Sequence, residues 1–255
     1  MIQTEAERFA EVLTDTPADA RVPTCPDWNA GDLLWHLTEV HLFWAGVLST
    51  GAVSDEDVAE VGESIGRRPG TLPELLALRK QATGSLIAAL RSLNDADRRW
   101  SWWGPDQTVG FTRRMQTYEA ALHRVDAELT AGLAPRSFSE GVAAGAVDHC
   151  ADVMWGWMPD GAHYTAGGLV ELSPSDTGQR WLVEVGHWAA TSTESGRSFQ
   201  GPRAVRASDG SPGALFRGSA QDLALWAWGR GGTVEPTGDA DAVAQMQRVI
   251  AAGIQ

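Results

Sequence analysis

The hydrophobic periodicity of this 255-residue chain changes near residue 135, and this change limits the folds open to it. Before that point, apolar residues recur every three or four positions, which is the spacing of amphipathic helices. After it, short segments such as GGLVELS and RWLVEVG indicate strands. A helical part followed by a mixed part is typical of a two-domain α+β chain. The sequence therefore predicts one domain over residues 1–135 and a second over 136–255.

Four helices are expected in the first domain, over residues 2–14, 29–49, 71–93 and 111–130. Asn29 precedes the second helix as an N-cap, and Thr71 stands three residues before Glu74, which is capping-box spacing. A polar, glycine-containing link is expected between the second and third helices, from about 49 to 70. Four helices with one longer connection predict a four-helix bundle.

The second domain is expected to be a smaller α+β unit. A helix is predicted at 141–157, strand-like sequence continues to about residue 215, and helical patterns return in SAQDLALWAWGR and DADAVAQMQRVIAAG. Cys150 is expected to be buried within the first of these helices, with its neighbours Asp148 and His149 on the surface.

Charge and composition exclude several classes of partner. The chain has 33 acidic and 20 basic side chains and a net charge of −13, a field that repels nucleic acids and anionic lipid surfaces. No apolar run is long enough to span a membrane. Cys25 and Cys150 form no C-x-x-C motif, and the N-terminal residues lack a signal segment. We expect a cytoplasmic globular protein without nucleic-acid or membrane partners.

The expected helix at 111–130 carries a carboxylate and an imidazole one turn apart. Glu119 and His123 lie about 40° from each other around the helix axis, beside the apolar stripe. Together they would supply two ligands of a divalent metal. His36 is the best candidate for the third, because an unpaired imidazole on the interior face of its helix would cost roughly 1–3 kcal/mol. Asp126 is placed to orient the ring of His123 as a hydrogen-bond acceptor.

Spacing alone leaves the structural alternative open. A glutamate and a histidine on a helix border are often solvated, and a lone histidine on an apolar face is more often a satisfied core residue. His41 lies about 140° around the helix from His36, so it is expected to be structural rather than a further ligand. Trp100, Trp102 and Trp103 would either wall a substrate cleft or cap the bundle.

Three separated motifs resemble the mycothiol-dependent maleylpyruvate isomerase family of actinobacteria, which is related to DinB-like four-helix proteins. VPTCPDWNAGDLLWHLTEVH resembles the start of the family helix that bears the first metal-binding histidine. TRRMQTYEAALHRVDAE resembles its E-x-x-x-H helix, and GSAQDLALWAWGR its sterol-carrier-like C-terminal domain. The resemblance spans nearly the whole chain.

The resemblance implies a divalent metal, usually zinc, held by His36, Glu119 and His123, with mycothiol and a small-molecule substrate as partners. A coordinated thiol loses its proton and becomes a nucleophile. Arg230 is the nearest match to the family arginine that binds the substrate carboxylate. Tyr118 stands where many relatives carry a histidine, a difference that bears on the chemistry of the pocket rather than on the three ligands.

The expected function is thus metal-dependent thiol chemistry, either S-transfer or cis–trans isomerisation of the maleylpyruvate type. Two alternatives stay open at this stage. The first is a metal-dependent hydrolase or lyase that uses no thiol. The second is a non-catalytic protein that binds a small molecule.

Overall fold

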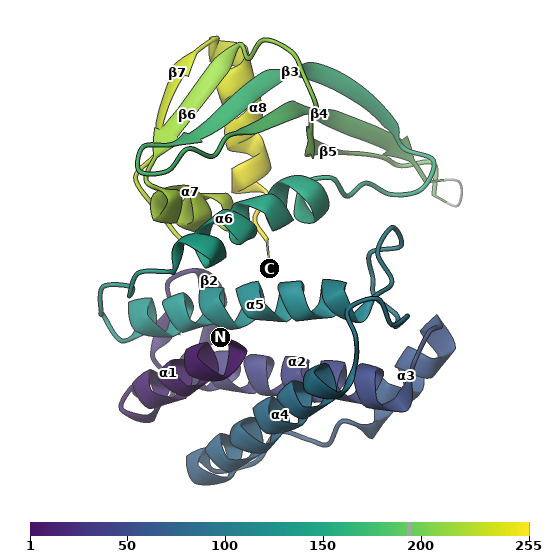
Figure 1. Ribbon diagram of the computed structural model, residues 1–255, viewed down its shortest axis with the longest axis vertical. Helices are drawn as coiled ribbons and strands as arrows, with labels where there is room; N and C mark the ends of the chain where they lie inside the picture. Colours follow the sequence, from purple (N-terminus) through teal and green to yellow (C-terminus); the bar gives the residue numbers. More distant parts are fainter. Residues whose placement is uncertain (193–194, 255) are drawn as a thin grey trace. The chain divides into compact units, whose positions relative to one another are not determined.

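The computed structural model describes residues 1–192 and 195–254 and divides into two compact units, Met1–Arg136 and Ser137–Gln255. The first unit is helical, and the second combines a sheet with helices (Figure 1). The predicted α+β fold class is therefore confirmed. Among the described residues, no helix combines the length and the hydrophobicity that crossing a bilayer requires.

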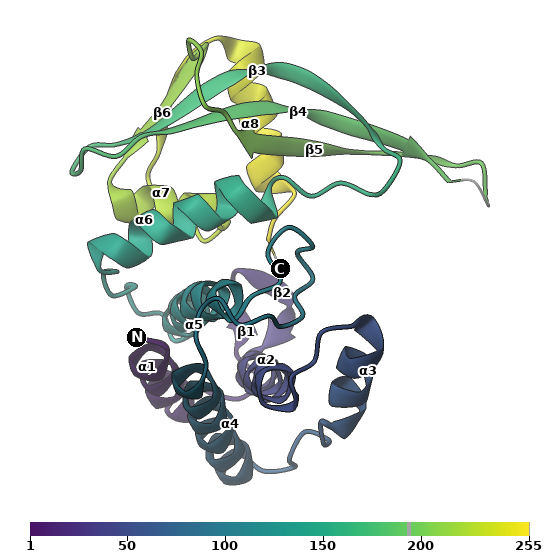
Figure 2. The same ribbon diagram turned by 45° about the vertical axis from the view of Figure 1, so that its right-hand side comes forward.

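Four long helices form the bundle of the first unit. They are α1 (Ile2–Thr14), α2 (Ala30–Thr50), α4 (Leu72–Ser92) and α5 (Val109–Thr130). Helix α2 packs on α4, and α1 packs on both α5 and α4 (Figures 1 and 2). Their facing sides bury large apolar side chains, among them Phe9, Leu33, Leu37, Leu86 and Leu122. This buried face accounts for the 3.6-residue periodicity of the sequence.

The helix starts follow the capping signals in the sequence. The Asn29 side chain accepts a hydrogen bond from the backbone N–H of Asp32 at 2.9 Å, and the Asp32 carboxylate accepts one from Asn29 at 3.1 Å. The Thr71 hydroxyl caps α4 by accepting from the backbone N–H of Glu74 at 3.4 Å, and it donates to the Glu74 carboxylate at 2.7 Å. These caps satisfy N–H groups that have no partner within the helix. The predicted starts of α2 and α4 are confirmed.

The link expected over 49–70 is wrong in part, because it contains the short helix α3 (Asp55–Ser64). Ser54 and Asp57 form a capping box at its start, and Val61 is its only buried residue. A helix with so little apolar surface leaves almost no periodic signal. A small antiparallel hairpin of β1 (Arg21–Val22) and β2 (Cys25–Asn29) also precedes α2.

A network of charged side chains joins the end of α5 to α1. The buried carboxylate of Glu128 accepts hydrogen bonds from Arg8 Nε at 3.1 Å and from Arg124 Nη1 at 2.6 Å. Arg124 also donates to Glu5 at 2.8 Å and to the carbonyl of Arg136 at 2.8 Å. The backbone N–H of Arg136 closes the network on Glu128 at 3.0 Å.

The second unit is built on a five-stranded sheet of order β5-β4-β3-β6-β7, in which only the β3–β6 pair is parallel. The strands are β3 (His163–Pro174), β4 (Trp181–Thr191), β5 (Ser198–Arg206), β6 (Ala214–Gly218) and β7 (Glu235–Gly238). Helices α6 (Glu140–His149), α7 (Ala220–Ala227) and α8 (Ala240–Ala251) lie on one face of this sheet (Figures 1 and 2).

Two expectations for this unit are corrected. The helix predicted at 141–157 ends its α-helical part at His149 and continues as one π-helical turn, Cys150–Met154. His149 is buried rather than exposed, and its ring stacks on Trp228 at a centroid distance of 6.0 Å. Cys150 is buried, as expected. A wider helical turn changes which side chains face inward, and the sequence pattern alone does not reveal it.

Candidate metal centre

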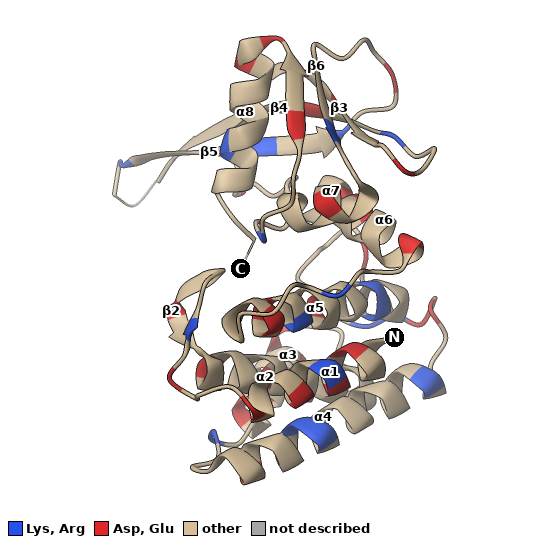
Figure 3. Ribbon diagram, turned by 90° about the vertical axis from the view of Figure 1, so that its left-hand side faces the viewer, with Lys and Arg blue, Asp and Glu red and all other residues tan. Residues whose placement is uncertain are grey.

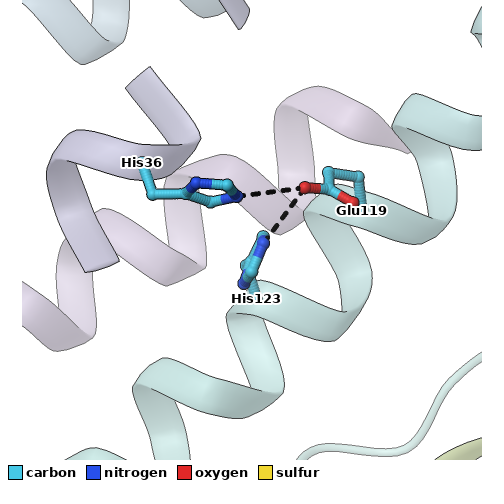
Figure 4. A group of neighbouring side chains, drawn as sticks. All are labelled: His36, Glu119 and His123. Carbon is cyan, nitrogen blue, oxygen red and sulfur yellow. Dashed lines mark hydrogen bonds and ion pairs between the residues drawn. The ribbon is translucent and has the colours of Figure 1, made fainter. Parts of the chain in front are cut away.

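Two helices of the bundle bring His36, Glu119 and His123 together. His36 lies in the second turn of α2, while Glu119 and His123 lie one turn apart on α5 (Figure 4). Nε2 of His36 is 3.3 Å and Nε2 of His123 is 3.1 Å from the same carboxylate oxygen, Oε1 of Glu119. The ligand atoms of all three lie within 4.8 Å of one another. The structure thus gathers the three residues that the sequence pattern singled out.

The cluster is closed on one side and open on another. The side chain of His123 is 7% exposed, that of Glu119 23% and that of His36 28%. A small molecule can therefore approach the cluster from the His36 side. An open coordination position is what distinguishes catalytic from structural metal sites.

A buried relay fixes the orientation of His123. Nδ1 of His123 is 2.9 Å from Oδ2 of Asp126, which is fully buried. The other oxygen of Asp126 accepts a hydrogen bond from the Thr24 hydroxyl at 2.6 Å. The contact expected between Asp126 and His123 is confirmed, and Thr24 is an addition from the hairpin loop. Such acceptors set the tautomer of a metal-binding imidazole.

Trp28 of strand β2 covers the imidazoles. Its ring centroid is 4.7 Å from that of His36 and 6.4 Å from that of His123, and the two imidazoles meet edge-on at 4.8 Å. Trp100, Trp102 and Trp103 are the tryptophans for which the sequence leaves a cleft wall or a bundle cap open. Trp100 stacks on Trp44, and Trp102 donates to the sulfur of Met115 at 3.3 Å. Their contacts favour the interpretation that the loop caps the bundle.

The charges within the cluster depend on each other. Burial opposes the ionisation of Glu119, but the neighbouring charge of His123 and the hydrogen bonds of both imidazoles hold the pKa of Glu119 well below its ordinary value. Burial alone would lower the pKa of His123, but the Glu119 carboxylate and the hydrogen bond to Asp126 raise the pKa of His123 to about 9. A buried carboxylate and a protonated imidazole thus stabilise each other.

The donor set fits a divalent metal. Because Nδ1 of His123 faces a carboxylate, that nitrogen carries a proton, and Nε2 of a neutral ring would point its lone pair at the Glu119 oxygen. Two acceptors at 3.1 Å repel each other unless a positive charge lies between them. A proton does this in the metal-free protein, and a metal ion would do it with the ligand set His₂Glu.

Two other residues from the sequence analysis lie outside the cluster. Nδ1 of His41 contacts the Thr83 hydroxyl at 2.9 Å, and burial lowers the pKa of His41 to about 3, so this residue is a neutral core histidine. Arg230 belongs to the second unit, where its Nη1 donates to the carbonyls of Trp228 at 2.7 Å and Ile254 at 2.8 Å. Its role in binding a substrate carboxylate stays a prediction.

By its fold and its side chains, the first unit is a helical bundle with a candidate metal site. Two histidines and one glutamate from two of its helices form that site. Residues 2–128 match the family model described as the mycothiol maleylpyruvate isomerase N-terminal domain. Through this segment the chain belongs to the mycothiol-dependent maleylpyruvate isomerase family, and the resemblance stated from its motifs is confirmed.

Comparison with solved structures supports the same fold over nearly the whole chain. The crystal structure of the mycothiol-dependent maleylpyruvate isomerase aligns with a TM-score of 0.59 and 16% identity, covering 94% of this chain and 91% of that one. A variant of that enzyme in which a histidine is replaced by alanine aligns over the same shares with a TM-score of 0.55 and 16% identity. At this identity the likeness shows the fold alone. No curated protein sequence is significantly similar to the chain.

Proposed function

We propose that this protein is a metal-dependent enzyme that uses a low-molecular-weight thiol, mycothiol, as an S-transferase or as a cis–trans isomerase of the maleylpyruvate type. The observation that carries the proposal is the contact of two imidazole nitrogens with one carboxylate oxygen at the open edge of the bundle. Family membership supports an enzyme, and the donor set supports a divalent metal, with zinc as the first candidate.

The residues of the chain would prepare the site in three ways. Asp126 and Thr24 keep Nε2 of His123 aimed at the cluster. Glu119 supplies negative charge that offsets the cation, and Trp28 keeps water from one side of the two rings. A bound divalent cation would supply a Lewis acid that keeps a coordinated thiol deprotonated at neutral pH.

The proposed reaction starts with the thiolate. In the isomerase form, a bound thiolate would supply a nucleophile that adds reversibly to a conjugated double bond and so allows rotation about it. In the transferase form, the adduct would be kept, with the proton that the thiol lost returned to the substrate carbon. Arg230 is the proposed partner of a substrate carboxylate, with its orientation fixed by the two carbonyls that hold Nη1.

The first experiment is metal content by mass spectrometry, on protein purified without chelator or nickel affinity. We expect about one equivalent in the wild type and a large loss in His36→Ala, Glu119→Ala and His123→Ala. His163→Ala is the matched control, because this exposed histidine begins strand β3 of the other unit. A wild type that neither contains metal nor takes up added zinc would exclude the proposed site. So would site variants that keep their full metal content.

The thiol requirement separates the proposal from hydrolase or lyase chemistry, because His₂Glu is also a donor set of metal-dependent hydrolases. The metal-loaded enzyme is assayed on maleylpyruvate and on electrophilic substrates, with mycothiol and without it. Turnover that requires mycothiol supports thiol chemistry, and equal turnover without any thiol contradicts it.

A further inference from the structure

A groove lies between α1 and α4 in the first unit, lined by a different set of residues from the metal centre. It encloses about 440 Å³ and is lined by Gln3 and Glu7 of α1 and by one face of α4. Gly84 hollows its wall, since a Cβ at this position would have no atom within 4 Å. Figure 3 shows α4 beside α1, with basic segments of α4 in blue. The groove therefore has space for a ligand and cations along one side.

The most buried cation of the groove is Arg79, at one end of the α4 lining; it takes part in no salt bridge among the described residues, although the Glu7 carboxylate acts on its charge from a distance. Arg79 is only 7% exposed, and its Nε has no hydrogen-bond partner among the described residues. Arg124, the other deeply buried arginine of this unit, has several hydrogen-bond acceptors within the protein. It is 2% exposed and donates to Glu5, to Glu128 and to the carbonyl of Arg136. A buried guanidinium that lacks these acceptors lowers stability unless an anion from outside completes its contacts.

The other charges of the groove are also mainly positive. Lys80, the only lysine of the sequence, and Arg91 line it together with Arg79. The one acidic side chain in the lining is Glu7, whose Oε1 accepts a hydrogen bond from Gln3 at 2.9 Å. Three cations against one anion are unusual in a chain of net charge −13. This excess favours an anionic ligand.

The remaining lining limits what else would be recognised. The hydroxyl of Thr83 donates to the carbonyl of Arg79 at 2.9 Å and contacts Nδ1 of His41 at 2.9 Å, so its hydrogen bonds are directed inside the protein. Ile87 and Ala88 supply apolar wall. A ligand of this groove would be held by charge at one end and by a short apolar contact at the other.

We propose that this groove binds a small organic dianion, a dicarboxylate or a phosphate monoester, with the Arg79 guanidinium as its main contact, the exposed Lys80 beside it, and Arg91 at the far end of the groove adding to the positive field. Guanidinium groups bind both kinds of anion through paired hydrogen bonds. Such a site is independent of the metal and of the proposed catalytic function.

The single lysine allows a direct test. Reductive methylation with ¹³C-formaldehyde labels only Lys80 and the N-terminal amine and keeps their charge, so that Lys80 reports on the groove by NMR. Succinate, phenyl phosphate and inorganic phosphate are titrated separately at constant ionic strength. We expect a saturable shift of the Lys80 signal with a Kd below about 5 mM for at least one organic dianion, and a weaker response to inorganic phosphate.

Paired variants decide whether the binding belongs to the groove. Arg79→Gln should weaken binding by at least about tenfold, while Arg67→Gln, which removes an exposed charge from the link before α4, should leave it unchanged. Gly84→Leu should abolish binding by filling the groove, and Gly84→Ala should keep it.

Thermal melting verifies that each variant folds, and if Arg79→Gln does not fold, the Gly84 pair decides alone. A shift that is absent in the wild type, or equal in Gly84→Leu and Gly84→Ala, would overturn the proposal. Arg79 would then be a buried arginine that solvent or Glu7 satisfies.

Discussion

Two of the carboxylates of helix α5, Glu119 and Glu128, differ in how the chain satisfies them. Glu128 accepts hydrogen bonds from Arg8, Arg124 and the backbone of Arg136, so its charge is balanced within the polypeptide. Among the described residues, Glu119 hydrogen-bonds to two imidazoles, which balance its charge when a proton or a metal ion joins them. The first arrangement is complete as folded. The second is completed by a proton or, as proposed above, by a metal ion.

The largest effect is expected from breaking the complete arrangement. Glu128→Ala leaves the guanidinium of Arg124 with fewer acceptors in a buried position, and we expect a loss of about 3–5 kcal/mol in the free energy of unfolding. Denaturant titration measures it. Glu11→Ala is the control, because Glu11 pairs with Arg8 at 2.9 Å on the surface, and it should have little effect. Equal effects of the two substitutions would refute the distinction between the carboxylates.

Adding metal should stabilise the incomplete arrangement by a similar amount. At a zinc concentration a thousandfold above Kd, the free energy of unfolding of the wild type should rise by about 4 kcal/mol. Glu119→Gln should show little of this gain, because the amide is a poor ligand for zinc. Thermal melting with and without zinc measures the difference. If zinc does not change the free energy of unfolding of the wild type, the distinction between Glu119 and Glu128 is contradicted.

The pH dependence should distinguish the proton from the metal as the shared cation. The pKa of His123 is raised to about 9 in the metal-free protein, above its value of about 6.5 in an unfolded chain. This contribution to stability is fully present below about pH 6.5 and is lost as the pH rises through 9. Zinc affinity should instead rise with pH, by about tenfold per pH unit from pH 7 to 9, because His123 must lose one proton before it binds zinc. Chelator-treated protein with a flat stability profile over this range would show that His123 is not protonated.

A smaller effect is expected from the relay behind His123. Asp126→Asn should weaken zinc binding by about 10- to 100-fold, since the amide no longer fixes the ring through a charged acceptor. Thr24→Val should also weaken zinc binding, but less strongly, because the Thr24 hydroxyl bonds to the Asp126 oxygen that does not contact His123. Competition with a zinc-sensitive dye measures both affinities. An unchanged zinc affinity in Asp126→Asn would show that the relay does not contribute to zinc binding.

The sequence predicts the parts of the site that depend on helical spacing. Glu119 and His123 follow from the i, i+4 relation, and His36 from its place on the interior face of a helix whose cap at Asn29 is visible in the sequence. The orientation of α2 against α5, which brings the three together, enters only through the family resemblance. Local periodicity does not determine how two helices approach each other when their ligand residues, His36 and Glu119, are 83 positions apart in the chain.

The parts that the sequence does not predict depend on irregular or distant backbone. Thr24 and Trp28 reach the site from a hairpin too short to give an alternating pattern. Arg8 meets Glu128 across 120 positions of the chain. Helix α3 had a usable signal in its Ser54 capping box, but its polar surface concealed its periodicity. The sequence therefore identifies single helices better than the contacts that complete a site.

The network at Glu128 also determines where a fragment of this protein can be cut. The family match ends at residue 128, but the carboxylate there depends on the backbone N–H of Arg136, and Arg124 depends on the carbonyl of the same residue. A fragment that stops at 128 would leave its last charged residues without these partners. Expression of the helical unit by itself should therefore extend through Arg136, and eight further residues would separate a stable fragment from a frayed one.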